Sequence, residues 1–255
     1  MTAESTVHFA PRAGGFAPAH AWDRNFFLLL VGLIWLGILV GFGWDVVDHV
    51  QSNEAPYALI VHVHAAVFVG WLVLLTTQVA LIRVRRPDLH RRLGVLGAAL
   101  VPVMVVLGLA TAWIVQRAAY DPAHPHTAFM SVNITSMLGF GGLAAAGILM
   151  RRQASAHKRM MLLSTMFLSN AGFARWFGFV VGHALGTGFW PFFAQIWLGA
   201  DVLIVALGVY DLVTRRTLHP AYMLGVGWIA INEVACAWLY YDPWWRGFSP
   251  SLIGH

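Results

Sequence analysis

Long apolar runs, separated by short polar stretches, make up most of the chain. A helix needs about 20 apolar residues to cross the hydrocarbon core of a bilayer. Seven segments approach or reach that length: residues 25–44, 57–82, 93–116, 126–150, 160–182, 190–210 and 221–241. The last three contain internal charges, at Arg175, Asp201 and Glu233. The pattern predicts an all-α, polytopic membrane protein with seven transmembrane helices.

The composition agrees with a membrane protein and excludes other classes. Of the 255 residues, 59% are hydrophobic and 11% charged, whereas soluble domains carry about 25% charged residues. A sequence pI of 9.9 is compatible with nucleic-acid binding. We exclude nucleic acid because the basic residues lie in short runs between apolar segments, where they mark topology. The single cysteine, Cys236, excludes an internal disulfide and a cysteine-based metal centre.

The positions of the basic residues predict the orientation. All but Arg117, Arg175 and Arg246 fall on one side of the seven segments. The positive-inside rule places that side in the cytoplasm. We therefore expect a cytoplasmic arm at 1–24, including Arg12, one transmembrane domain at 25–241 and a periplasmic tail at 242–255.

Each predicted cytoplasmic loop carries two arginines followed by a histidine. The three copies are Arg85-Arg86…His90, Arg151-Arg152…His157 and Arg215-Arg216…His219. The repetition predicts one leading helix followed by three related hairpins. One interpretation is that the arginines anchor helix ends to lipid headgroups while the histidines cap or pair locally. A cytoplasmic ligand site is the alternative.

Small residues predict where helices approach each other closely. Gly37 and Gly41 form a small-xxx-small pair in the first segment, and Gly178 and Gly182 form another in the fifth. Pro102 is expected to kink the third helix.

Histidines gather near the predicted outer ends of the segments. Six of the 12 lie there: His49, His62, His64, His124, His126 and His183. Folding the first two segments as a hairpin puts Asp45 at the depth of His62 and His64, with Asp48 and His49 on the same face as Asp45. His62 and His64 diverge by about 200° on a helix, so one of them, which we expect to be His64, faces inward.

Imidazole and carboxylate groups at this depth suggest a bound metal or cofactor. Such ligands suit zinc, iron, copper or nickel, and two imidazoles on facing helices suit a haem. The predicted cofactor ligands are His64 and His126, and the predicted metal ligands are Asp45, His49, His62, His64 and His126. A histidine near the interface also bonds to a backbone carbonyl or snorkels, so the prediction requires that these side chains meet.

A second polar group consists of the charges inside the later segments. A charge deep in the membrane is costly and normally finds a partner in the bundle interior. Arg175 and Asp201 fall within about two residues of rise in depth, which predicts a salt bridge and leaves Glu233 as the unpaired carboxyl. Such charges either fix helix register or form a catalytic, proton-handling or anion-binding pocket.

Two stretches resemble a known group of proteins. They are HVHAAVFVGWLVLLTTQVALIRVRRPDLHRRLG (residues 62–94) and HKRMMLLSTMFLSNAGFARW (residues 157–176), and AWDRNFF at 21–27 fits the same group. The chain resembles uncharacterised bacterial multi-span membrane proteins, found chiefly in proteobacteria. The resemblance implies a bacterial inner-membrane protein with His64, His90, His157 and Arg175 in the shared motifs. It implies no activity, because the group has no settled one.

These observations favour one function and leave two others open. The leading expectation is a membrane oxidoreductase with a haem or a zinc, copper or iron site toward the periplasm, acting on a lipid-soluble, quinone-like substrate. Arg175, Asp201 and Glu233 would then form the catalytic pocket. The alternatives are a non-catalytic transporter or ligand-binding protein, and a structural subunit of a homo-oligomer or a larger membrane complex.

Overall fold

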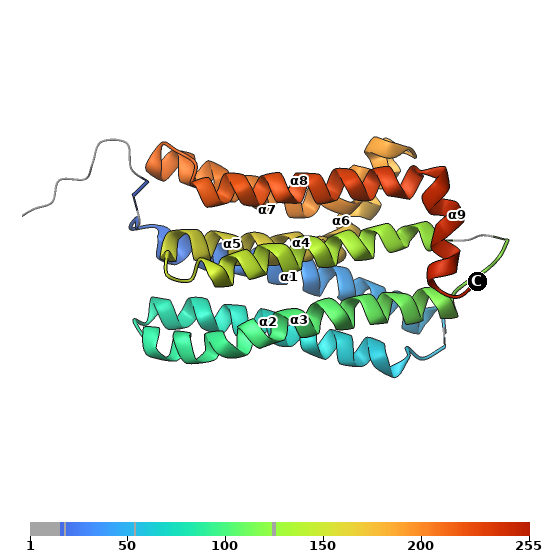
Figure 1. The fold of residues 1–255 in the computed structure, drawn as a ribbon, viewed down its shortest axis with the longest axis horizontal. Helices are drawn as coiled ribbons and strands as arrows, with labels where there is room; N and C mark the ends of the chain where they lie inside the picture. Colours follow the sequence, from blue (N-terminus) through green and yellow to red (C-terminus); the bar gives the residue numbers. More distant parts are fainter. Residues whose placement is uncertain (1–15, 18, 54, 124–125) are drawn as a thin grey trace, which may run out of the picture.

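The computed structural model describes residues 16–17, 19–53, 55–123 and 126–255 (Figure 1). Most of the predicted arm, including Arg12, and also His124 lie outside these ranges. All regular secondary structure in the described part is helical. The helices are α1 (Asp23–Gln51), α2 (Leu59–Arg83), α3 (Pro87–Ala118), η1 (Thr127–Phe129), α4 (Met130–Leu149), α5 (Ala154–Leu168), α6 (Asn170–Leu185), α7 (Phe189–Arg215), α8 (Pro220–Tyr241) and α9 (Pro243–Leu252).

Six helical stretches within the described residues are long and apolar enough to cross a membrane. They are α1, α2, α3, the run Thr127–Leu149, α7 and α8. The chain is therefore all-α and has the architecture of a multi-pass membrane protein. These six stretches coincide with six of the seven predicted segments, because each carries an uninterrupted apolar run of sufficient length.

The long helices run side by side along one axis (Figure 1). The α2–α3, α4–α5 and α7–α8 connections lie at one end, which we call the basic end because it carries Arg85, Arg86, Arg151, Arg152 and Arg216. Helix α9 lies across the opposite end, which we call the α9 end. Helix α5 occupies the centre, where it contacts α4, α7 and α8, and every residue at 162–170 is buried.

The predicted fifth segment, 160–182, is divided into α5 and α6 at Ser169. The Ser169 hydroxyl donates to the carbonyl of Met166 at 2.6 Å, and its backbone N–H donates to Thr165 and Met166. These short-range bonds tighten the turn and compete with the regular helical pattern. Each half is consequently a short helix, with Ser169 as the single residue between them.

Glycines bring α6 against both of its neighbours. A Cβ atom on Gly41 of α1 would collide with the backbone of Gly172, and one on Gly37 would collide with the Phe173 ring. On the other side, Gly178 and Gly182 lie against Gln195 of α7. The predicted close approach at both small-residue pairs is confirmed. The kink predicted at Pro102, which lies inside α3, stays a prediction.

The predicted tail at 242–255 contains a helix that the apolar pattern does not indicate. Asp242 caps α9 by accepting a hydrogen bond from the Trp245 N–H at 3.0 Å, and Pro243 occupies the first helical position. Both are ordinary helix-start signals. Trp245 packs with Ala128, Met130 and Ile253 in a small separate core at this end.

Candidate functional site

Asp45, His64 and Arg175 come together from three helices in the half of the bundle toward α9. Helical rise places each of them about 30 Å from the basic end. Arg175 Nε lies 3.3 Å from Asp45 Oδ1, and its guanidinium covers the Phe42 ring at 4.1 Å. His64 lies within electrostatic range of Arg175. Its Nδ1 is buried and has no hydrogen-bond partner among the described residues.

The prediction that His64 rather than His62 faces inward is confirmed. His62 is exposed, whereas His64 is partly buried and stacks on Phe68 at 3.9 Å. Trp71, two turns further along the same face of α2, is buried, and its indole N–H donates to the Thr165 hydroxyl of α5 at 3.1 Å. Because His64 and Trp71 lie on one face of α2, His64 also faces the bundle.

The predicted salt bridge between Arg175 and Asp201 is wrong. Arg175 pairs with Asp45 of α1 instead, and Asp201 contacts a carboxyl group on α8. Matching depths along two helices fix only the axial position of a side chain. The direction in which each side chain points depends on which helices surround it, and α6 packs against α1 on the face that carries Arg175.

The structure does not gather the predicted metal ligands into one cluster. His49 stacks on Tyr57 at 3.9 Å, and the His62 ring lies 6.4 Å from the same tyrosine. His126 is exposed at the start of η1. Among the described residues, no group of three or more His, Cys, Asp or Glu side chains is placed to hold a metal ion. Haem or metal ligation with fewer protein ligands stays a prediction.

Asp201 of α7 and Glu233 of α8 form a pair of carboxyl groups in the bundle. Their side chains lie within hydrogen-bonding reach of each other. Glu233 is only 5% exposed, and its Oε1 is buried and has no hydrogen-bond partner in the described part of the chain. A hydrogen bond between two carboxyl groups requires a proton on one of them. The arrangement is therefore favourable when the two groups share one proton and unfavourable when both are charged.

The carboxyl pair lies close to the middle of its helices. Helical rise places Asp201 and Glu233 about 20 Å from the basic-end termini of α7 and α8, compared with a hydrocarbon core of about 30 Å. The two carboxyl groups lie next to each other within the bundle. Arg175, the cation predicted for this pocket, is engaged with Asp45.

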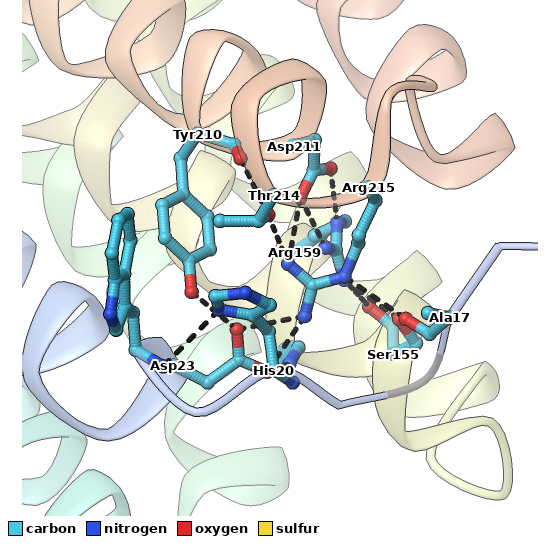
Figure 2. A network of polar contacts seen from close by, with 11 residues as sticks. Ala17, His20, Asp23, Ser155, Arg159, Tyr210, Asp211, Thr214 and Arg215 are labelled. Atoms are coloured by element: carbon cyan, nitrogen blue, oxygen red, sulfur yellow. Dashed lines mark hydrogen bonds and ion pairs between the residues drawn. The ribbon is translucent and has the colours of Figure 1, made fainter.

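A buried ionic network closes the basic end (Figure 2). Arg159 of α5 and Asp211 of α7 are both 0% exposed. Arg159 Nε donates to Asp211 Oδ2 at 2.7 Å, and a second guanidinium nitrogen reaches Oδ1. The remaining terminal nitrogen of Arg159 donates to the carbonyl and the hydroxyl of Ser155. The guanidinium is thus held on several sides.

The network continues to the start of α1 through Asp23. This carboxylate accepts hydrogen bonds from Lys158 at 2.8 Å, Tyr210 at 2.6 Å and Arg215 at 2.8 Å. Arg215 Nε also donates to the carbonyl of Ala17, which precedes α1 (Figure 2). The network joins α1, α5 and α7 at this end of the bundle.

The sequence prediction missed this network. From the sequence, Lys158 and Arg159 are interpreted only as markers of the cytoplasmic side and Arg215 also as part of a repeated loop, and Asp211 is not singled out. One signal was present: Asp211 precedes Arg215 by four residues at the end of an apolar run, a spacing at which opposite charges meet on a helix.

The histidines of the repeated loops have local partners. His157 Nδ1 lies 2.8 Å from the carbonyl of Gly147. His219 Nδ1 accepts a hydrogen bond from the Ala221 N–H at 3.0 Å and so caps α8. These contacts confirm the local interpretation for both residues. The His90 and His157 rings lie 6.1 Å apart and nearly perpendicular, and His90 Nδ1 is buried without a hydrogen-bond partner in the described residues.

Comparisons with protein-family models, with curated proteins and with solved structures found no match to this chain.

Proposed function

We propose that the chain crosses the membrane seven times, with the basic end in the cytoplasm. Helices α5 and α6 follow one another with only Ser169 between them, and their combined rise of about 48 Å is enough for one further crossing. Seven crossings put the amino terminus inside and α9 outside. The arginine-rich loops at one end support this orientation, and the family resemblance supports placement in a bacterial inner membrane.

We further propose that the protein takes up and releases a proton at the Asp201–Glu233 pair, as part of proton-coupled transport. The observation that carries this proposal is the close pairing of two carboxyl groups near the middle of the bundle, one of them the buried Glu233, whose Oε1 has no hydrogen-bond partner in the described residues. Ionisable groups at such a depth are costly and mark proton or ion pathways in pumps and transporters. This develops the non-catalytic alternative stated from the sequence.

The proton balance of the pair is simple. With one proton shared, the pair carries one negative charge. Binding of a second proton, at the Glu233 oxygen that has no hydrogen-bond partner among the described residues, makes the pair neutral, and its release restores the charge. A charged pair costs more free energy to bury than a neutral one. Proton binding therefore favours the conformation in which the pair is more deeply buried, and in this way a proton drives a change between conformations.

Infrared difference spectroscopy across a pH titration of the purified protein tests this proposal. We expect a C=O stretching band of a protonated carboxyl that grows on acidification and is lost in the double variant Asp201→Asn/Glu233→Gln. Asp48→Asn, which makes the same chemical change at an exposed carboxyl of α1, should keep the band. A wild-type protein without such a band, or a double variant that retains it, would overturn the proposal.

A second function is favoured by a separate observation at His64. Its buried Nδ1 has no hydrogen-bond partner in the described part, and the Arg175–Asp45 ion pair lies beside it. A free imidazole nitrogen suits a haem or a zinc, copper or iron ion, or a hydrogen bond to a quinone-like substrate. The predicted membrane oxidoreductase would then use this group of residues rather than the carboxyl pair.

Optical absorption and elemental analysis of the purified protein test the second function. A Soret band or a stoichiometric metal that is lost in His64→Ala, but kept in His183→Ala, would support it. His183 is a suitable control because it is exposed and bonds to the carbonyl of Phe179 within its own helix. Neither a band nor a metal in the wild-type protein would argue against it.

A further inference from the structure

A stripe of hydroxyl groups runs along α4 and η1 toward the α9 end. Thr127, Ser131 and Thr135 follow each other at intervals of four residues, so they lie on one helical face. All three are buried. Thr135 Oγ1 donates to the Ser131 carbonyl at 2.7 Å, which leaves its lone pairs free to accept another hydrogen bond.

Cys236 connects the stripe to the carboxyl pair. It lies one helical turn after Glu233 on α8, on the same face, and it is within electrostatic range of that carboxyl. The Cys236 thiol is fully buried and contacts the hydroxyls of Thr135 and Ser131, with Sγ 4.0 Å from Ser131 Oγ. The thiol therefore joins the hydroxyls of Thr135 and Ser131 and lies one helical turn from Glu233.

The stripe ends under α9. The Ser249 hydroxyl, which is fully buried, donates to Thr127 Oγ1 at 2.8 Å. Beside this bond, the Trp245 indole donates to the Ala128 carbonyl at 3.1 Å. Helix α9 thus covers the end of the stripe with polar contacts rather than with a purely apolar surface.

The half of the bundle between the carboxyl pair and the basic end is different. Leu163, Ile204, Leu207 and Ile229 are buried there and form part of the main apolar core. Below this apolar layer, Arg159 and Asp211 hold α5 and α7 together. Two hydroxyls buried in this half, those of Ser164 and Tyr222, donate to the backbone carbonyls of Met161 and Ile204. The basic side of the pair is therefore mainly apolar, whereas the α9 side carries the polar stripe.

We infer that the Asp201–Glu233 pair exchanges its proton with the aqueous phase at the α9 end, along Thr135, Cys236, Ser131, Thr127 and Ser249. The inference rests on the proposed function of the pair and adds the side from which the proton comes. Each hydroxyl or thiol accepts a proton from one neighbour and donates its own to the next, so one proton reaches the pair and every group in the stripe ends with one proton. Ser131 and Thr127 are separated by one helical turn, about 6 Å, which one bridging water molecule spans.

The only cysteine of the chain allows a direct test with the unmodified protein. A small, charged, membrane-impermeant methanethiosulfonate reagent is added to either side of oriented proteoliposomes, and modification of Cys236 is followed by mass spectrometry. We expect reaction from the α9 side to be at least ~10-fold faster than from the basic side. Faster reaction from the basic side, equal rates, or no reaction from either side would each overturn the inference.

The rate of proton exchange gives a second test that separates the two proposals. After transfer into D2O, the carboxyl C=O band should shift at least ~10-fold more slowly in Thr127→Val and Ser131→Ala than in the wild-type protein, with an unchanged titration midpoint. Ser164→Ala is the matched control, because Ser164 is a buried hydroxyl on α5 that donates to the Met161 carbonyl of its own helix. If the carboxyl band titrates with pH but its exchange rate is unchanged in both stripe variants, the route is refuted and the proton site is not. If the band does not titrate with pH, the proton site itself is refuted.

Discussion

Arg159 of α5 and Asp211 of α7 form a two-point ion pair in which both side chains are completely buried. The pair ties the central helix of the bundle to one of its neighbours at the basic end. Burying two charges costs several kcal/mol for each ion, and the mutual attraction offsets this only while both partners and their further hydrogen bonds are present. The bonds from Arg159 to Ser155 supply part of that requirement.

Removal of one partner should therefore lower the stability of the fold more than removal of both partners. We expect Arg159→Met to lower the free energy of unfolding by about 3–5 kcal/mol, because the buried Asp211 loses its two-point partner and keeps only a longer contact, 3.7 Å, with Arg215. The double variant Arg159→Met/Asp211→Leu should lose clearly less. Unfolding in detergent by denaturant measures both, with the exposed Arg152→Met as control. A double variant as unstable as the single one would contradict this account.

The contact between α1 and α6 makes a separate prediction about glycine. A Cβ atom on Gly172 would collide with the backbone of Gly37 and Ile38. Backbone atoms cannot move aside as a flexible side chain can, so we expect Gly172→Ala to destabilise the protein by about 1–3 kcal/mol. Gly43→Ala on α1 is the matched control, because nothing lies within 4 Å of its Cβ position. Equal thermal stability of the two variants would contradict the packing described here.

The apolar pattern predicted most of the fold because the bilayer sets one simple requirement. A crossing needs an apolar run of sufficient length, and the six long helical stretches of the described chain each contain such a run. The break at Ser169 was not predicted, because it depends on hydrogen bonds of one side chain with the preceding turn. Helix α9 was missed because it is short, although Asp242 and Pro243 are recognisable start signals.

The pairing of charged residues was harder to predict than their depth. Arg175, Asp201 and Glu233 were correctly identified as polar groups within helices, but Arg175 pairs with Asp45. Depth follows from counting residues along a helix, whereas the partner depends on which helices are neighbours. No sequence pattern indicated that α6 lies between α1 and α7. Asp211 was overlooked for a related reason, since a carboxylate at a helix end is usually solvated.

Reporter fusions distinguish seven crossings from six. Seven crossings place residue 255 outside the cell, whereas six would return it to the side of the basic end. We expect alkaline phosphatase to be active when fused after residue 255 and inactive when fused after residue 217. A fluorescent protein that folds only in the cytoplasm should give the opposite result at both sites. An inactive phosphatase at residue 255, in cells that produce the full-length fusion, would contradict the proposed topology.

His219 should give the protein a pH-dependent stability. Its neutral ring caps α8 by accepting the Ala221 N–H, and burial lowers the pKa of His219 below its usual value. A base with a lowered folded-state pKa stabilises the fold above its unfolded-state pKa of about 6.5, and this contribution is lost as the pH falls through the lowered value. We expect the unfolding temperature to decrease over that acidic range.

Two substitutions at this position separate capping from titration. His219→Asn replaces the cap with an amide that does not titrate, so it should keep stability near neutral pH and weaken the acidic decrease. His219→Ala should lose about 1 kcal/mol at neutral pH because the cap is absent. The prediction fails if the asparagine variant shows the same pH profile as the wild-type protein.

The Asp201–Glu233 pair should differ from the Arg159–Asp211 pair in its effect on stability. Arg159 and Asp211 have opposite charges and hold helices together, whereas Asp201 and Glu233 are two acids that lie next to each other. A pair retained for proton exchange rather than for stability is expected to cost stability. The double variant Asp201→Asn/Glu233→Gln should therefore unfold at the same temperature as the wild-type protein or at a higher one, while Arg159→Met unfolds at a lower one. A loss in the double variant as large as that in Arg159→Met would instead assign the carboxyl pair a structural role.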